Sequence, residues 1–393
     1  MFPGSRLPPR TLGCLVAAAG LAVGGCGTLP AAGPSASQIV AAERHEDGPQ
    51  PPLIDIDERV VAVERAAPAP SLVHRFPAHG VPGEPTIGVG DGVVVSIWEA
   101  AAGGLFSSAP GDQPGPGSHS VVLPEQVVGR DGAISVPFAG RIACAGRLPL
   151  EVQRAIERRL AGKAIEPQAI VSVEHSVNDT ATVTGEVIKG AVVPLSLKGD
   201  RLLDLIASAG GAKTPVYETS IRLSRGAVTA TIPMERLVAD PAENIYAEPG
   251  DVLTVVRSPQ SFTVLGAAGQ NSEIPFPAAR LSLIEALGRA GGLQDFRSDP
   301  AGVFLFRWES PAVVEALGVA HAAPAADGRI GVIYRLDLGN PRSYLAAQQF
   351  AVRDKDVLYI ANAGAIELQK FMNIINGLTG PAVTGAVIKN ATQ

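Results

Sequence analysis

Along most of this chain, hydrophobic residues recur at the spacing of a β-strand, every second residue, or of an α-helix, every three to four residues. Short apolar or alternating runs predict strands in four places: Leu53–Val63, Val93–Trp98, Ala133–Pro137 and Ile170–Val173. One helix is predicted from about Leu150 to Leu160, because Val152, Ile156 and Leu160 recur at helical spacing. The mixture predicts an α+β protein.

The last apolar stretch, 365–388, has two unlike faces. At 100° per residue, one face carries uncharged polar or small residues: Gln369, Asn373, Asn376, Gly380 and Thr384. The opposite face carries Phe371, Ile374, Ile375 and Leu378. A helix of this length reaches about 36 Å, enough to cross a bilayer core of about 30 Å. Several copies in a ring would point the apolar face at lipid and line a wet lumen with Gln369, Asn373, Asn376 and Thr384.

An ordinary amphipathic helix docked on a soluble core is the alternative for that stretch. Such helices are far commoner than pore walls. Pro381 also removes one backbone hydrogen bond and predicts a kink near Gly377.

An internal repeat lies upstream of this stretch. Residues 182–211 align without a gap to residues 263–292, at a constant offset of 81. Each copy predicts two strands, then one amphipathic helix that ends in a Gly-Gly pair, then further strands. Each copy closes on a related phrase, EPGDVLTVV at Glu248–Val256 and RDKDVLYIA at Arg353–Ala361. One helix across a small mixed sheet predicts a β-grasp-like unit, and an Ala/Pro-rich insertion, Ser310–Arg329, lengthens the second copy.

The first 25 residues are typical of an export signal. Arg6 and Arg10 precede a short apolar run, and Val23-Gly24-Gly25-Cys26 resembles a bacterial lipobox. A lipobox predicts cleavage before Cys26, followed by attachment of diacylglycerol to its sulfur and of an acyl chain to the new amino terminus. Apart from these covalent lipids, we predict no cofactor. Gly27, in place of an aspartate, favours the outer membrane. A plain secretory signal cut elsewhere is the alternative, and residues 27–52 are typical of a flexible tether.

Charge and candidate chemistry exclude several functions. Loss of Arg6 and Arg10 with the signal would change the formal net charge from −6 to −8, and no basic stripe is present, which argues against nucleic acid. The six histidines have no metal-ligand spacing, and no nucleophile motif occurs. Asp55 and Asp57 fit a solvated strand edge better than an acid/base pair. Cys144, the only other cysteine of the mature chain, is predicted to be a core residue.

A triplet of glycines before the strand at 93–98 does not indicate a nucleotide site. Gly88, Gly90 and Gly92 run into a strand rather than opening a helix, so the dinucleotide fingerprint lacks its context. We therefore predict no catalytic and no metal-binding residues, and no enzymatic activity.

These parts, in this order, resemble the bacterial outer-membrane polysaccharide export proteins. The resemblance rests on the lipobox, on IGVGDGVVVSIWE with DGAISVPFAGRI, on the two repeats and on ELQKFMNII near the end. It implies an octameric, ring-stacked homo-oligomer with a helical outer-membrane barrel. It also implies a polysaccharide cargo and an inner-membrane co-polymerase or transporter complex as partner. The Ser310–Arg329 insertion and Pro381 depart from the pattern.

The resulting fold prediction is α+β: a β-rich export domain, two β-grasp-like repeats and a C-terminal amphipathic transmembrane helix. The predicted domains are 1–25 (signal), 26–85 (lipid-anchored linker with one strand), 86–178 (export domain), 179–260 (first repeat), 261–363 (second repeat) and 364–393 (membrane helix). The predicted function is an oligomeric outer-membrane channel subunit for capsular or exopolysaccharide, with most of the chain in the periplasm. A periplasmic lipoprotein that binds a soluble ligand or cell-wall glycan is the alternative, and a secretin-like subunit that moves proteins is a weaker one.

Overall fold

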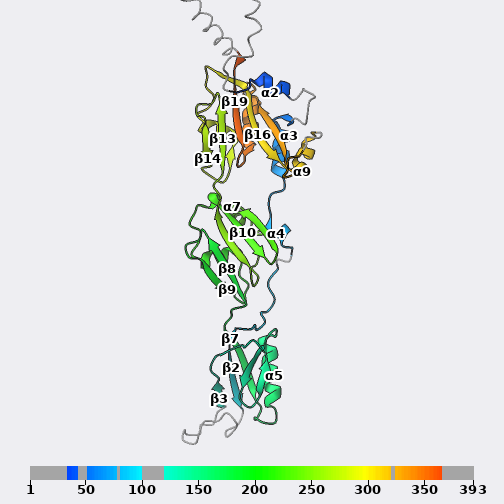
Figure 1. Cartoon of the computed structure of the whole chain (residues 1–393), viewed down its shortest axis with the longest axis vertical. Helices are drawn as coiled ribbons and strands as arrows, with labels where there is room; N and C mark the ends of the chain where they lie inside the picture. The colour runs from blue at the N-terminus through cyan, green and yellow to red at the C-terminus, as the bar shows by residue number, and fades with distance from the viewer. Residues whose placement is uncertain (1–32, 43–50, 78–79, 100–118, 320–323, 365–393) are drawn as a thin grey trace, which may run out of the picture. The chain divides into compact units, whose positions relative to one another are not determined.

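The computed structural model describes residues 33–42, 51–77, 80–99, 119–319 and 324–364. It shows a mixed α+β protein with several sheets (Figure 1), which confirms the predicted class. The chain forms two compact units. Ala69–Pro259 make one of them, and the residues before Ala69 join those from Gln260 onward in the other.

The export domain is built around strand β2. It pairs with three others in a four-stranded sheet, and a separate hairpin and helix α5 complete the domain. The elements are β2 (Gly92–Glu99), β3 (His119–Val122), β4 (Gln126–Val127), β5 (Ala133–Val136), β6 (Gly140–Ala143), α5 (Pro149–Leu160) and β7 (Gln168–His175). Helix α5 packs on β7 through Val152, Ile156 and Leu160, all fully buried, as predicted. Cys144 is also buried in this core, and burial raises the pKa of its thiol.

The first repeat is a five-stranded sheet in the order β11-β10-β12-β8-β9. Its elements are β8 (Thr180–Gly185), β9 (Ala191–Pro194), α6 (Leu202–Ser208), η1 (Val216–Glu218), β10 (Thr219–Arg225), β11 (Val228–Pro233), α7 (Met234–Ala239) and β12 (Val252–Arg257). The short helix α4 (Leu72–Arg75) from the linker packs on β11. Buried Glu243 holds it there by accepting the Leu72 N–H at 2.7 Å.

The second repeat repeats these elements at the predicted offset. Its elements are β13 (Ser261–Gly266), β14 (Ser272–Pro275), β15 (Leu281–Ser282), α8 (Leu283–Arg289), β16 (Ser298–Glu309), α9 (Pro311–Leu317), β17 (Ile330–Leu336), α10 (Pro341–Gln349), β18 (Ala351–Val352) and β19 (Val357–Asn362). The bounds of β13, β14 and α8 lie 81 residues after those of β8, β9 and α6. The paired glycines also match, since Gly185 and Gly266 both have φ near +90°.

Residues before the first repeat complete the second one. Helix α2 (Ala36–Ala42), strand β1 (Leu53–Asp55) and helix α3 (Glu58–Ala66) belong to the same compact unit as β13–β19. Strand β1 joins the six-stranded sheet, whose order is β1-β17-β16-β19-β13-β14. Figure 1 shows α3 beside β16 and α9 within this unit. The stretch that we predicted to be tether and linker thus supplies three elements to a folded domain.

The prediction of a single strand over Leu53–Val63 is wrong. The strand ends at Asp55, and a helix starts at Glu58. Asp57 causes the change, because its carboxylate caps the helix by accepting the Val60 N–H at 2.8 Å. An aspartate followed by Glu58 in the first turn is a helix-start signal that outweighs the β-branched valines. Asp55 remains at a solvated edge, paired with Arg335 at 2.5 and 2.9 Å.

The insertion in the second repeat contains helix α9. Its buried Val313, Val314 and Leu317 extend the core of this repeat toward α3. Arg59 of α3 donates to the Leu317 carbonyl at 3.2 Å. The insertion therefore covers the N-terminal helix.

Candidate functional site

Every residue that we predicted to touch membrane or cargo lies outside the described residues. These are Cys26, the pore-lining set Gln369, Asn373, Asn376 and Thr384, and the lipid-facing set Phe371, Ile374, Ile375 and Leu378. The helices of the described ranges include none that is long and apolar enough to cross a bilayer. The candidate site within the structure is therefore the region of the second repeat from which both chain ends leave.

The first described segment, which begins at Gly33, contacts strand β19 near the last described residue on one face of the second repeat. The Tyr359 hydroxyl of β19 donates to the Pro34 carbonyl at 2.7 Å. Ile39 of α2 is buried in a small cluster with Phe304, Tyr359 and Ala361. Strand β19 ends at Asn362, one residue after Ala361 and three residues before the start of the predicted helix at 365. The two ends of the described chain thus lie close together on this repeat.

The contact between these segments depends on small residues. A Cβ atom at Gly302 of β16 would lie 3.1 Å from that of Ala36 and 3.0 Å from that of Ala361. At these distances a neighbouring atom would have to move by a few tenths of an ångström to admit a Cβ atom. The glycine at position 302 thus lets helix α2 lie close on the sheet without that shift.

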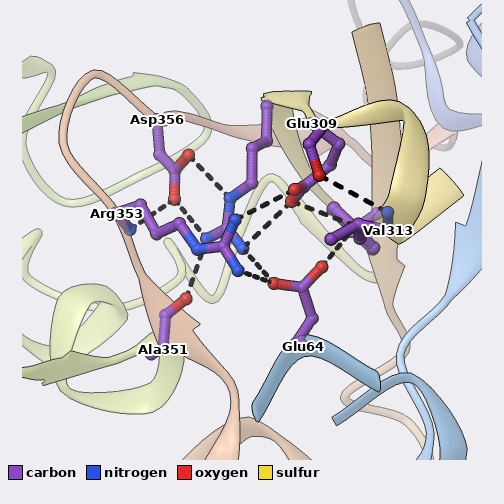
Figure 2. A network of polar contacts seen from close by, with 9 residues as sticks. Glu64, Glu309, Val313, Ala351, Arg353 and Asp356 are labelled. Carbon is purple, nitrogen blue, oxygen red and sulfur yellow. Dashed lines mark hydrogen bonds and ion pairs between the residues drawn. The ribbon is translucent and has the colours of Figure 1, made fainter. Parts of the chain in front are cut away.

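A second set of residues, the ion cluster of Figure 2, joins α3 to the opposite side of the same sheet. It consists of Glu64, Arg307, Glu309, Tyr334, Arg353 and Asp356. The Arg307 side chain is only 3% exposed and donates to Asp356 at 3.0 and 2.6 Å. The Nη2 atom that binds Asp356 also donates to the Ala351 carbonyl at 2.8 Å, and Nη1 donates to Glu64 at 3.1 Å. A buried guanidinium with all its partners in place fixes the position of α3.

Arg353, Glu309 and Tyr334 complete the ion cluster. Arg353 pairs with Glu309 at 2.9 Å and with Glu64. The Tyr334 hydroxyl lies 2.8 Å from Glu64 and 3.2 Å from Glu309. Burial and the neighbouring Glu64 charge raise the pKa of Glu309. The guanidinium groups of Arg307 and Arg353 thus meet the carboxyl groups of Glu64, Glu309 and Asp356 in one cluster.

Asp356 of the cluster belongs to a turn that occurs in each of the three domains. An aspartate accepts the N–H of the residue three positions earlier and leads into a strand: Asp91 from Gly88 at 2.6 Å, Asp251 from Glu248 at 2.9 Å, and Asp356 from Arg353 at 2.7 Å. A left-handed residue comes before each aspartate: Gly90, Gly250 and Lys355. In the repeats, the same aspartate receives an arginine, Arg225 or Arg307.

The sequence analysis missed this cluster. A signal was present, since the aligned closing phrases place Asp251 and Asp356 at equivalent positions. Arg307 and Glu309 also interrupt an aromatic run in a strand that is otherwise apolar. A charged residue within a buried strand predicts a buried partner. Glu64 could not be identified in this way, because it is 243 residues away in sequence from Arg307.

Comparison with known proteins gives three domain matches and several relatives. Residues 80–174 match the family described as polysaccharide biosynthesis/export protein, and residues 180–235 and 260–360 each match the SLBB domain. The chain is 36% identical to the capsule polysaccharide export outer membrane protein CtrA of Neisseria meningitidis serogroup B, over 94% of this chain and 95% of the relative. It is 33% identical to the capsule polysaccharide export protein BexD of Haemophilus influenzae, over 94% and 96%. The Vi polysaccharide export protein VexA/TviF of Salmonella typhi is 27% identical, over 72% of this chain and 75% of the relative.

Proposed function

This chain belongs to the outer-membrane polysaccharide export family, and we propose that it is the oligomeric channel subunit through which a capsular or exopolysaccharide strand leaves the periplasm. The observation that carries the proposal is similarity to capsule export proteins along nearly the whole chain. In this function the protein performs no covalent chemistry. It binds and guides a polymer that an inner-membrane polysaccharide complex delivers.

The convergence of the chain ends supports a common point of membrane entry. Six residues lie between Cys26 and Gly33, the first described residue, and the seven steps from one to the other span at most about 25 Å. The predicted helix starts directly after Gly364, beside the same face. An acyl group on Cys26 and a helix over 365–388 would therefore enter the membrane close together, as a lipid-anchored barrel requires.

The ion cluster supports a structural role for the second repeat, which we propose to hold the membrane-attached end of the protein. It ties α3, and with it the lipid-anchored N-terminal segment, to the strands that lead into the predicted helix. Its charged groups pair with one another and with a main-chain carbonyl. The cluster thus stabilises the fold at the end that carries both membrane attachments.

Deletion of the gene in its own host tests the export function. We expect surface polysaccharide to disappear and polymer to accumulate inside the cell, with recovery by the wild-type gene. Cys26→Ser should lose its acyl chains and restore little export, because the precursor is not processed as a lipoprotein. Cys144→Ser serves as the matched control, since this cysteine is a small core residue. Normal surface polysaccharide in the deletion strain would reject the proposal.

Particle mass separates the channel from the alternative of a monomeric ligand-binding lipoprotein. The intact protein, extracted in mild detergent, should have the mass of a closed ring of several subunits. A monomer would favour the ligand-binding lipoprotein, which has no need of a polar stripe opposite a lipid face.

Cysteine labelling tests the predicted pore helix. Asn373→Cys and Asn376→Cys should react with a small hydrophilic maleimide added to whole cells, because their side chains would line a lumen open to the outside. Ile375→Cys, on the predicted lipid face, should react poorly. Labelling of Asn373→Cys or Asn376→Cys only after the outer membrane is broken would contradict an outward-opening channel.

A further inference from the structure

The two homologous sheets differ at their edges. In the second repeat, the outer edge of β17 is covered by β1, which pairs with it in parallel along Ile333–Arg335. The Ile333 N–H donates to the Pro52 carbonyl at 2.9 Å, and the Ile56 N–H donates to the Arg335 carbonyl at 2.8 Å. A strand from the N-terminal segment thus satisfies the edge of this sheet.

The equivalent edge of the first repeat is β11, and it has no such cover. Arg225 faces Val228 across the ladder as Arg307 faces Val332, so Thr229 and Thr231 correspond to Ile333 and Arg335. Among the described residues, β10 is the only strand that pairs with β11. The strand reads Val-Thr-Ala-Thr-Ile-Pro, without a charge to repel another strand.

The opposite edges differ in the same way. In the second repeat, Glu273 of edge strand β14 pairs with Lys355 at 3.0 Å and accepts from Ser261 at 2.5 Å. A charged pair on an edge strand discourages strand addition. The equivalent residue of β9 in the first repeat is Val192, which is 63% exposed. Among the described residues, the first repeat therefore has two uncharged edge strands without an outer partner, whereas in the second one edge is paired with β1 and the other carries a charged pair.

Strand directions make these two open edges complementary. Strand β10 is antiparallel to both β11 and β12, β12 is parallel to β8, and β8 is antiparallel to β9. Strands β9 and β11 therefore run in opposite directions. When copies stand side by side in the same orientation, β9 of one copy meets β11 of the next as an antiparallel pair, the more stable kind of pairing.

We infer that the first repeat is the strand-pairing contact between subunits, with β9 of one copy hydrogen-bonded to β11 of the next. This inference rests on the proposed oligomer and names the surface that builds it. The contact joins different edges of the same sheet, so it is heterologous and closes into a ring when the rotation per subunit allows. Pro194 and Pro233 end the two edges and limit each contact to a few hydrogen bonds around Val192 and Thr231.

Disulfide trapping tests this contact in the full-length protein in outer membranes. Val192→Cys is combined in one chain with Thr231→Cys, and in a second variant with Thr229→Cys, because facing residues of an antiparallel pair have Cβ atoms about 5 Å apart. We expect at least one pair to give a ladder of covalent multimers on mild oxidation, reversed by reductant. Each variant with only one of these introduced cysteines should form no covalent multimer and migrate as a single chain on a denaturing gel. The matched control combines Glu273→Cys with Arg335→Cys, the equivalent positions in the second repeat. It should also form no covalent multimer.

The other outcomes identify what has failed. A covalent dimer from a variant with one introduced cysteine would mean that β9 meets β9, or β11 meets β11, of the next copy. That outcome would overturn the pairing of β9 with β11. Multimers from the second-repeat control, or an adduct with a different protein, would overturn it as well. A ring-sized particle in which neither first-repeat pair cross-links overturns the edge contact and leaves the proposed function intact. A monomeric particle overturns both.

Discussion

The two repeats share an architecture and differ in what surrounds them. In the first, Arg225 binds Asp251 and Glu248, both within 26 residues of it in sequence. In the second, the residue equivalent to Glu248 is Arg353, so a second arginine lies beside buried Arg307, and Glu64 from the N-terminal segment pairs with both. One charge reversal thus accompanies the attachment of a distant helix.

Their sheet edges extend the comparison. The N-terminal segment covers β17, and β14 carries a charged pair, whereas no strand of the described ranges pairs with the outer edge of β9 or β11. A duplicated domain can keep its core and turns while its edges adapt to different neighbours. The second repeat is completed by its own chain, and the first is left with edges that suit another copy.

The largest expected effect tests what the repeats have in common. A Cβ atom at Gly185 would lie 2.0 Å from the Val255 oxygen, and one at Gly266 would lie 2.1 Å from the Ile360 oxygen. Both glycines also have positive φ, so Gly185→Ala and Gly266→Ala should each destabilise their own repeat by about 4 kcal/mol or more. Hydrogen exchange with peptide-level mass spectrometry measures each repeat separately.

Gly288→Ala is the control for those substitutions. It lies in α8 with open space around it, and the first repeat has Ala207 at the equivalent position. We expect it to be neutral or to stabilise by up to about 1 kcal/mol. Equal protection in Gly185→Ala and wild-type protein would show that the close approach at this glycine is absent.

The next prediction separates the repeats. Glu64→Ala removes an acceptor from two arginines, one of them almost fully buried, and should cost the second repeat about 3 kcal/mol. Exchange should rise in α3 and β16 and remain unchanged in β10 and β12. Glu58→Ala, on the exposed first turn of α3, should change stability by no more than about 0.5 kcal/mol. Equal effects of Glu64→Ala and Glu58→Ala would contradict the role of the ion cluster.

Glu309 in the second repeat and Glu243 in the first should contribute to the pH dependence with opposite signs. Burial and the Glu64 charge raise the pKa of Glu309, so its contribution to the stability of the second repeat is lost as pH rises through that pKa. Burial would also raise the pKa of Glu243, but hydrogen bonds from Ser71 and Leu72 lower it overall. The first repeat should therefore lose stability as pH falls through that lowered value.

Each of these slopes is at most about 1.4 kcal/mol per pH unit for one proton. Hydrogen exchange across a pH series, corrected for the intrinsic exchange rate, measures them. Glu309→Gln mimics the protonated acid and should flatten the slope of the second repeat alone. A slope that survives this substitution would assign the proton to another group.

The smallest expected effect concerns the turn before the closing strand. Gly250 has φ +83° in the first repeat, and Lys355 occupies the equivalent left-handed position with φ +65° in the second. Gly250→Ala should cost about 1 kcal/mol because a side chain is strained there. Lys355→Gly relieves that strain and loses the pair with Glu273, so its net effect should stay within about 0.5 kcal/mol. Thermal unfolding of the two variants under the same conditions compares them, and a large loss in Lys355→Gly would show that the edge pair stabilises the fold.

Local signals determined much of this fold from sequence alone. The periodicity of Val152, Ile156 and Leu160 located α5, and the 81-residue offset located matching strands and helices in both repeats. These features depend on neighbouring residues, so one segment contains all the information that specifies them. The same reasoning failed over Leu53–Val63, because the capping side chain of Asp57 outweighed the strand propensity of the valines.

Only the tertiary structure decided which segments complete each repeat. Sequence placed Glu64 in a linker, yet it pairs with Arg307 and Arg353 far along the chain. It gave no sign that β1 covers β17 while β11 stays open. Pairing of distant strands and burial of distant charges depend on which surfaces the folded chain brings together, and no period or propensity within a segment encodes that choice.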